Sequence, residues 1–174
     1  MQKDLFRWEL MGFLFILIVG SVLHFVYNWS EKNPLVALFS PVNESTWEHL
    51  KLLFVPGLLY GIVEYFAIGQ KIDGFVFTKF VALLLGMLTI VILFYTYTGI
   101  VGTNYLWADI GTFVAGAALA FWFTVRKMPL SSDARTDLIG LFLFFVLIVL
   151  FILGTFCPPH IGLFLDPVTH SYGL

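Results

Sequence analysis

The sequence predicts an all-α integral membrane protein with five transmembrane helices, in a single membrane domain that covers residues 1–174. The chain is 60% hydrophobic, 18% aromatic and only 11% charged, so a soluble domain would leave much of its apolar surface uncovered. Five stretches are long enough to cross the bilayer as helices, which takes roughly 17 to 25 apolar residues. The basic residues are also divided unevenly between the two sides that these spans define.

The first span is expected at about residues 10–28, after Lys3 and Arg7. It is expected to remain as a membrane anchor because its apolar stretch is long and Val26-Tyr27-Asn28-Trp29 is not the small-residue site at which signal peptides are cleaved. The remaining spans are expected at about residues 46–69, 75–99, 106–125 and 138–156, followed by a tail at 157–174 and with a linker at 128–136 before the last span.

The second span contains a proline and an acid. Pro56 lacks a backbone N–H, so we expect the helix to kink there. Glu64 follows Thr46 by roughly 27 Å at the α-helical rise, which places it in the inner half of the membrane. An acid at this depth is costly and is a candidate functional residue. The alternative is that its side chain reaches toward Lys71.

The basic residues predict an internal N-terminus and an external C-terminus, because cytoplasmic segments retain Lys and Arg. Lys32 and Lys51 would then lie outside, and Lys51 is expected to reach the headgroups along its stem. Outer segments at residues 35–39 and 161–165 are too short to span, so we expect a re-entrant or interfacial loop and tail. The basic residues on the inner side are Lys3, Arg7, Lys71, Lys79, Arg126, Lys127 and Arg135.

The composition also excludes several functions. A net charge of −2 gives no basic surface for nucleic acid, and no glycine-rich nucleotide motif occurs in a strand-like context. The single cysteine, Cys157, has no partner for a disulfide or a thiolate metal site. Membrane lipid is the partner that the composition predicts. The sequence leaves open whether the chain works alone, as a homo-oligomer or with a partner membrane protein.

All four histidines lie on the predicted outer side, and several acids accompany them. Imidazole and carboxylate groups are the ligands of zinc when cysteine is absent, and three protein ligands with one open position are typical of a catalytic site. We therefore predict a site for zinc or another divalent metal there, although no H-E-x-x-H pair is present. The predicted metal ligands are His49, His160, Asp166 and His170.

Other polar residues receive roles around that site. Glu44 and Glu48 are the candidate catalytic residues, since a carboxylate beside a metal-bound water can act as general base. The candidate substrate-binding or relay residues are His24, Asn43, Glu64 and Asp109.

Ordinary structural roles compete with these assignments. Ser45 and Glu48 fit a capping box at the start of the second span. Residues 166–169, Asp-Pro-Val-Thr, fit a turn with Asp at its first position and Pro at its second. His24 is equally suited to a hydrogen bond with Asn28, one helical turn later.

Two stretches carry a family resemblance: residues 41–51, PVNESTWEHLK, and residues 164–173, FLDPVTHSYG. They resemble the signature motifs of an uncharacterised family, a domain of unknown function, of small bacterial multipass membrane proteins. The resemblance covers the whole chain. It implies a multipass fold in the bacterial plasma membrane, and it implies no activity.

A looser similarity links the chain to membrane hydrolases typified by alkaline ceramidase, which hold zinc among helix-borne His and Asp residues near a membrane face. The chain departs from them in having five predicted spans instead of seven and no H-x-x-x-H pair. This similarity is an analogy of chemistry alone.

The leading hypothesis is a membrane-embedded hydrolase that acts on a lipid or amphiphile at an outward-facing divalent-metal site. One alternative is a small transporter or channel that uses the outer cluster as a vestibule and Glu64 as a relay. Another is a structural subunit of a membrane complex.

Overall fold

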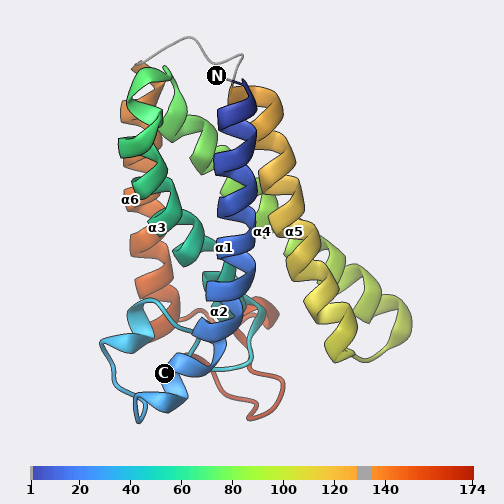
Figure 1. Cartoon of the computed structure of the whole chain (residues 1–174). Helices are drawn as coiled ribbons and strands as arrows, with labels where there is room; N and C mark the ends of the chain where they lie inside the picture. Colours follow the sequence, from blue (N-terminus) through green and yellow to red (C-terminus); the bar gives the residue numbers. More distant parts are fainter. Residues whose placement is uncertain (1, 129–134) are drawn as a thin grey trace.

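The computed structural model describes residues 2–128 and 135–174, and its regular elements are helices (Figure 1). Five segments are long and apolar enough to cross a membrane, which confirms the predicted spans. Residues 129–134 of the predicted linker lie outside the described residues. The long helices are α1 (Gln2–Trp29), α3 (Lys51–Ala67), α4 (Phe75–Val101), α5 (Leu106–Lys127) and α6 (Arg135–Phe156). The short ones are η1 (Val36–Leu38), α2 (Thr46–His49), η2 (Gly69–Lys71) and η4 (Gly162–Phe164).

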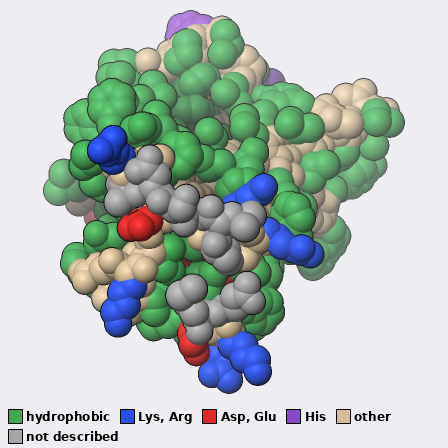
Figure 2. Space-filling view, turned by 90° about the horizontal axis from the view of Figure 1, so that it is seen from above, with side chains coloured by type: hydrophobic (Ala, Val, Ile, Leu, Met, Phe, Trp, Pro, Cys, Tyr) green, Lys and Arg blue, Asp and Glu red, His purple; other side chains and the backbone are tan. Residues whose placement is uncertain are grey.

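The two termini lie at opposite ends of the bundle, which we call its N-terminal and C-terminal ends (Figure 1). Figure 2 views the N-terminal end, and Lys and Arg side chains are distributed over this face. The predicted orientation would place this end on the inner side of the membrane. The loop after α1 and the tail after α6 both lie at the C-terminal end.

Two helix boundaries differ from the prediction. α1 begins at Gln2 instead of near residue 10, because Glu9 forms an ion pair with Lys79 inside the bundle and its charge does not have to lie outside. Lys79 is accordingly buried in α4 and is not a solvated inner-face cation. The second span is divided at Leu50 into α2 and α3, whereas α3 runs through Pro56 as continuous helix.

Pro56 still shapes the packing of the helices. Because it has no N–H, the carbonyl of Leu52 lacks its usual partner in the helix. A Cβ atom on Gly20 of α1 would lie 2.5 Å from the Leu52 carbonyl oxygen. The missing side chain at Gly20 therefore lets α1 come close to α3 where the proline frees a carbonyl.

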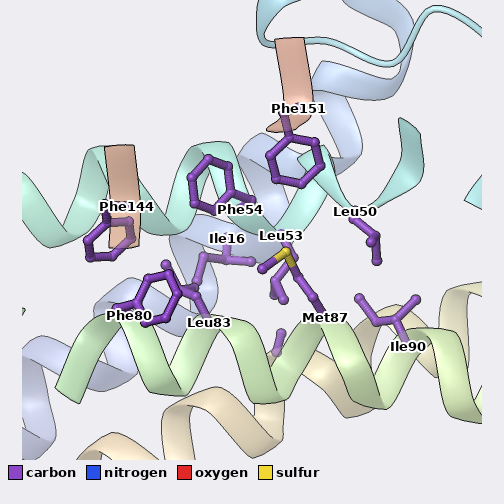
Figure 3. Close-up of a cluster of buried hydrophobic side chains, with 11 residues drawn as sticks. Ile16, Leu50, Leu53, Phe54, Phe80, Leu83, Met87, Ile90, Phe144 and Phe151 are labelled. Carbon is purple, nitrogen blue, oxygen red and sulfur yellow. The ribbon is translucent and has the colours of Figure 1, made fainter. Parts of the chain in front are cut away.

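An apolar core fills the middle of the bundle (Figure 3). Ile16 of α1 and Leu53 of α3 meet Met87 of α4 there, and rings from α3, α4 and α6 pack around them. On α1, and likewise on α2 and α3 taken together, this core lies between a carboxylate toward the N-terminal end and a histidine toward the C-terminal end. The fold thus separates two groups of polar residues.

Candidate metal centre

His24, Glu44 and His49 meet at the C-terminal end of the bundle. Nε2 of His49 lies 3.4 Å from Oε2 of Glu44, and Nε2 of His24 lies 3.9 Å from Oε1. One ligand atom from each residue lies within 4.8 Å of the other two, the only such group of three or more His, Cys, Asp or Glu residues in the described part of the chain. The prediction had left His24 out of the ligand set, and this contact brings it into the site.

A serine from the loop after α1 places His24. The hydroxyl of Ser40 donates to the carbonyl of Leu23 at 2.6 Å and accepts from the N–H of Tyr27 at 3.1 Å. These two backbone groups would otherwise bond to each other in a regular α-helix. A side chain inserted in this way bends a helix, and the last turns of α1, which carry His24, lean away from the rest of the helix in Figure 1.

The cap of α2 orients His49. Ser45 precedes the helix in an extended conformation, and its hydroxyl accepts from the N–H of Glu48. Nδ1 of His49 lies 2.9 Å from the carbonyl oxygen of Ser45, to which it can donate. The other ring nitrogen, Nε2, then faces Glu44: it donates to the carboxylate while His49 is protonated, and it offers an electron pair to an ion once that proton is lost. Fixing one imidazole nitrogen on a carbonyl is the usual way in which proteins direct the other toward a metal.

Glu44 is the most exposed of the three side chains, at 49%, against 31% for His24 and 30% for His49. A hydrogen bond from His49 is the main cause that holds the pKa of the Glu44 carboxyl below its ordinary value, although partial burial opposes it. The buried Nδ1 of His24 has no hydrogen-bond partner. The site therefore combines an ionised carboxylate with an imidazole whose polar atoms are not fully used.

Glu48, the other predicted catalytic residue, faces away from this cluster. Its Oε2 accepts from Lys51 Nζ at 2.7 Å and from the N–H of Val42, and its Oε1 accepts from Thr155 at 2.7 Å. Half of the predicted capping box is present, since the return bond from the carboxylate goes to Val42 instead of Ser45. Lys51 is fully buried and does not extend to the surface.

The two motifs on which the resemblance rests pack against each other. The side chain of Asn43 donates to the carbonyl of Gly173 at 3.0 Å and accepts from the N–H of Ser45. Trp47 packs against Phe164, with ring centroids 4.8 Å apart. The C-terminal tail therefore supports the segment that carries Glu44.

Asp166 lies beside Glu44 and holds the tail together. Its carboxylate accepts from the N–H of Val168 and the hydroxyl of Thr169, as expected for the predicted turn. Burial raises the pKa of Asp166, but hydrogen bonds from Thr169, Val168 and the Glu44 backbone outweigh it and hold the pKa below its ordinary value. The carboxylate thus has structural partners, although it was predicted as a ligand.

The remaining predicted residues lie outside the three-residue cluster. The ring of His160 stacks on Tyr172, with centroids 4.4 Å apart, and His170 is an exposed residue at φ 55°. Asp109 accepts hydrogen bonds from Tyr97 and Asn104 and interacts with His49 only electrostatically. Glu64 lies near the N-terminal end, in an ion pair with Lys79 instead of reaching Lys71.

The five apolar helices and this polar end define the class of the molecule, a multipass α-helical membrane protein. The chain belongs to a family of unknown function (DUF6512), which matches residues 1–174. No curated protein and no solved structure matches it. The membership agrees with the resemblance of the two motifs and assigns no activity.

Proposed function

We propose that the protein binds Zn²⁺ or a similar divalent ion through His24, Glu44 and His49, and that it hydrolyses a lipid or amphiphile at this site. The observation that carries the proposal is the convergence of the three ligand atoms within 4.8 Å. With three protein ligands, a tetrahedral ion keeps one position for water or substrate, as in catalytic zinc sites.

The separations between the ligand atoms support this assignment. Two zinc ligands at bonds of about 2.0–2.2 Å and a tetrahedral angle are about 3.3–3.6 Å apart. The Glu44–His49 separation of 3.4 Å falls in that range and the Glu44–His24 separation of 3.9 Å is slightly above it. The two distances go to different oxygens of Glu44, so closing the site around an ion takes side-chain rotations that bring ligand atoms now within 4.8 Å of one another to this spacing.

Hydrolysis is the reaction class that fits an open ion at this position. A bound divalent ion lowers the pKa of its water toward 7 and supplies hydroxide at neutral pH. In ester hydrolysis the hydroxide oxygen bonds to the acyl carbon, the acyl–oxygen bond breaks and the leaving oxygen takes the proton. Of the two predicted catalytic carboxylates, Glu44 serves in this proposal as an ion ligand, and Glu48 is occupied by Lys51 and Thr155.

The transporter alternative has less support at this site. Glu9 and His24 of α1 are fifteen residues apart, or about 22 Å at the helical rise. The apolar core lies between them. A transport route from the metal site would have to cross this packed region.

The first test is the metal content of protein purified without chelator. We expect one equivalent of metal per chain in the wild type, and loss of that metal in His24→Ala and His49→Ala. Metal affinity should also fall on acidification, because an imidazole must be deprotonated to bind. The matched controls are His160→Ala and His170→Ala, which should keep the metal.

Two outcomes would contradict the proposal in different ways. A wild-type protein that neither contains metal nor binds added Zn²⁺ would remove the metal site. Stoichiometric metal without hydrolysis of a fluorogenic ester amphiphile would leave the metal site and remove the hydrolase. If the wild type both binds metal and hydrolyses the ester, Glu44→Gln should lose hydrolysis while the chain stays folded.

Ser40 offers a test of how the site is built. In Ser40→Ala the N–H of Tyr27 can return to the carbonyl of Leu23, so α1 should straighten and move His24 away. We expect Zn²⁺ affinity to fall roughly tenfold, the lower end of what supporting residues contribute, measured by isothermal titration. Ser21→Ala is the control, because that hydroxyl bonds the Leu17 carbonyl of its own helix. Equal affinities in both variants would mean that Ser40 does not position His24.

A further inference from the structure

A second polar cluster lies toward the N-terminal end, where Glu9 of α1, Glu64 of α3 and Lys79 of α4 meet. Nζ of Lys79 lies 2.5 Å from Oε1 of Glu9 and 2.5 Å from Oε2 of Glu64. The exposed fractions of these residues are 4% for Glu9, 0% for Glu64 and 9% for Lys79. The two carboxylates also interact with each other.

The charges of this cluster do not balance if all three groups are ionised. Two carboxylates and one ammonium leave a net charge of −1 inside an apolar bundle, and an uncompensated buried charge is strongly unfavourable. One additional proton makes the cluster neutral. Oε2 of Glu64 contacts the ammonium of Lys79, whereas the buried Oε1 of Glu64 has no hydrogen-bond partner. A proton on one carboxyl supplies the donor that this buried pair lacks.

Among the described residues, the polar groups around the cluster that the contacts show supply no second cation. Tyr60 of α3 donates its hydroxyl to the carbonyl of Trp8. From α5, the polar residue at the adjoining cavity is Thr124, whose hydroxyl donates within its own helix. On the side of α6, Asp137 accepts from three N–H groups at the start of α4. Asp73, between η2 and α4, would only add negative charge.

Two cavities adjoin the cluster. A space of about 30 Å³, bordered by Glu9, Gly12, Tyr60 and Lys79, is large enough to hold a water molecule. A groove of about 720 Å³ between α3, α4 and α6 reaches Lys79 from the other side. The lining of this groove includes Gln70, Asp73 and Asp137 toward the N-terminal end.

We propose that Glu9, Glu64 and Lys79 form a buried proton-binding site, which holds one exchangeable proton between the two carboxylates beside a fixed ammonium. The proton exchanges with the aqueous phase at the N-terminal end through the groove. This site shares no residue with the metal centre and does not depend on the proposed hydrolysis.

The test is infrared spectroscopy of the full chain in lipid vesicles at neutral pH. The wild type should show the stretching band of one protonated carboxyl, and the band should shift in D₂O. Glu9→Gln and Glu64→Gln should each lose the band. The remaining carboxylate and the ammonium balance each other in charge, so no additional proton is needed. Lys79→Met should double the band, because both carboxyls then need a proton.

Glu44→Gln is the matched control, since the Glu44 carboxylate lies at the opposite end of the bundle. The protonated-carboxyl band of this variant should be as strong as that of the wild type. Circular dichroism identifies variants that do not fold. If a variant does not fold, the wild type alone tests the proposal, because its protonated-carboxyl band must disappear reversibly on alkaline titration. Absence of the band in folded wild type, or its persistence in both glutamine variants, would overturn the proposal and leave an ordinary ion cluster.

Discussion

Glu48→Ala is expected to lower the free energy of unfolding by about 3–5 kcal/mol, because it leaves a buried ammonium without its counter-charge. Lys51 Nζ lies 2.7 Å from Glu48 Oε2, 2.7 Å from the Thr155 hydroxyl and 2.8 Å from the carbonyl of Ala37. The side chains of Glu48 and Lys51 are only 2% and 1% exposed. Water therefore cannot replace the carboxylate that the substitution removes.

The measurement is denaturant unfolding of the purified protein in detergent, with a set of variants that separates charge from packing. Glu48→Gln should be less damaging, because the amide still offers an oxygen to Lys51. The double variant Glu48→Met with Lys51→Met should recover part of the loss, since it removes both charges. Lys3→Ala, at an exposed cation, should stay within about 0.5 kcal/mol of the wild type. A loss in Glu48→Ala as small as that in Lys3→Ala would contradict the prediction.

The same network explains why Glu48 is a poor candidate for catalysis and an important residue for the site. Glu48 accepts from Thr155 at the end of α6 and from Val42 in the loop after α1, and Lys51 donates to Ala37 in the same loop. That loop leads directly to Glu44. Glu48→Ala should therefore weaken metal binding through the fold, whereas Glu44→Gln should weaken it without a comparable loss of stability.

The five spans could be predicted because hydrophobicity summed over some twenty residues does not depend on which residues touch. The start of α1 could not be predicted in this way. Glu9 and Lys79 are 70 positions apart, and their pairing makes a charged turn compatible with the bundle only after both helices are placed. The burial of Lys51 could not be predicted from the sequence for the same reason, since one of its partners, Thr155, lies 104 positions away.

The place of the cluster of His24, Glu44 and His49 was easier to predict than its membership. Grouping residues by membrane side placed Glu44, His49 and the C-terminal tail at one end of the bundle. A shared side says nothing about the direction of a side chain, and the ring of His160 stacks on Tyr172. His24 joins the site through the insertion of Ser40 into α1, a contact between two segments that no spacing along the sequence reveals.

Gly116→Val is expected to lower the free energy of unfolding by about 1–3 kcal/mol or more, because α4 and α5 approach each other backbone to backbone at this residue. A Cβ on Gly116 would lie 2.6 Å from the carbonyl oxygen of Gly86, and one on Gly86 would lie 2.8 Å from that of Gly116. Small residues allow such approach between membrane helices, where hydrophobic burial does not drive association. Backbone cannot rotate out of the way, so the helices must separate.

Gly111→Val on the same helix is the matched control, since a Cβ there meets nothing within 4 Å. It should stay within about 0.5 kcal/mol of the wild type in the same unfolding assay. The two substitutions add the same atoms to α5, so their difference isolates contact with α4 from helix propensity. Equal effects would mean that the helices separate at little cost. The N-terminal half of α4, which holds Lys79 beside Glu9 and Glu64, would then lack the rigid support that a defined proton site requires.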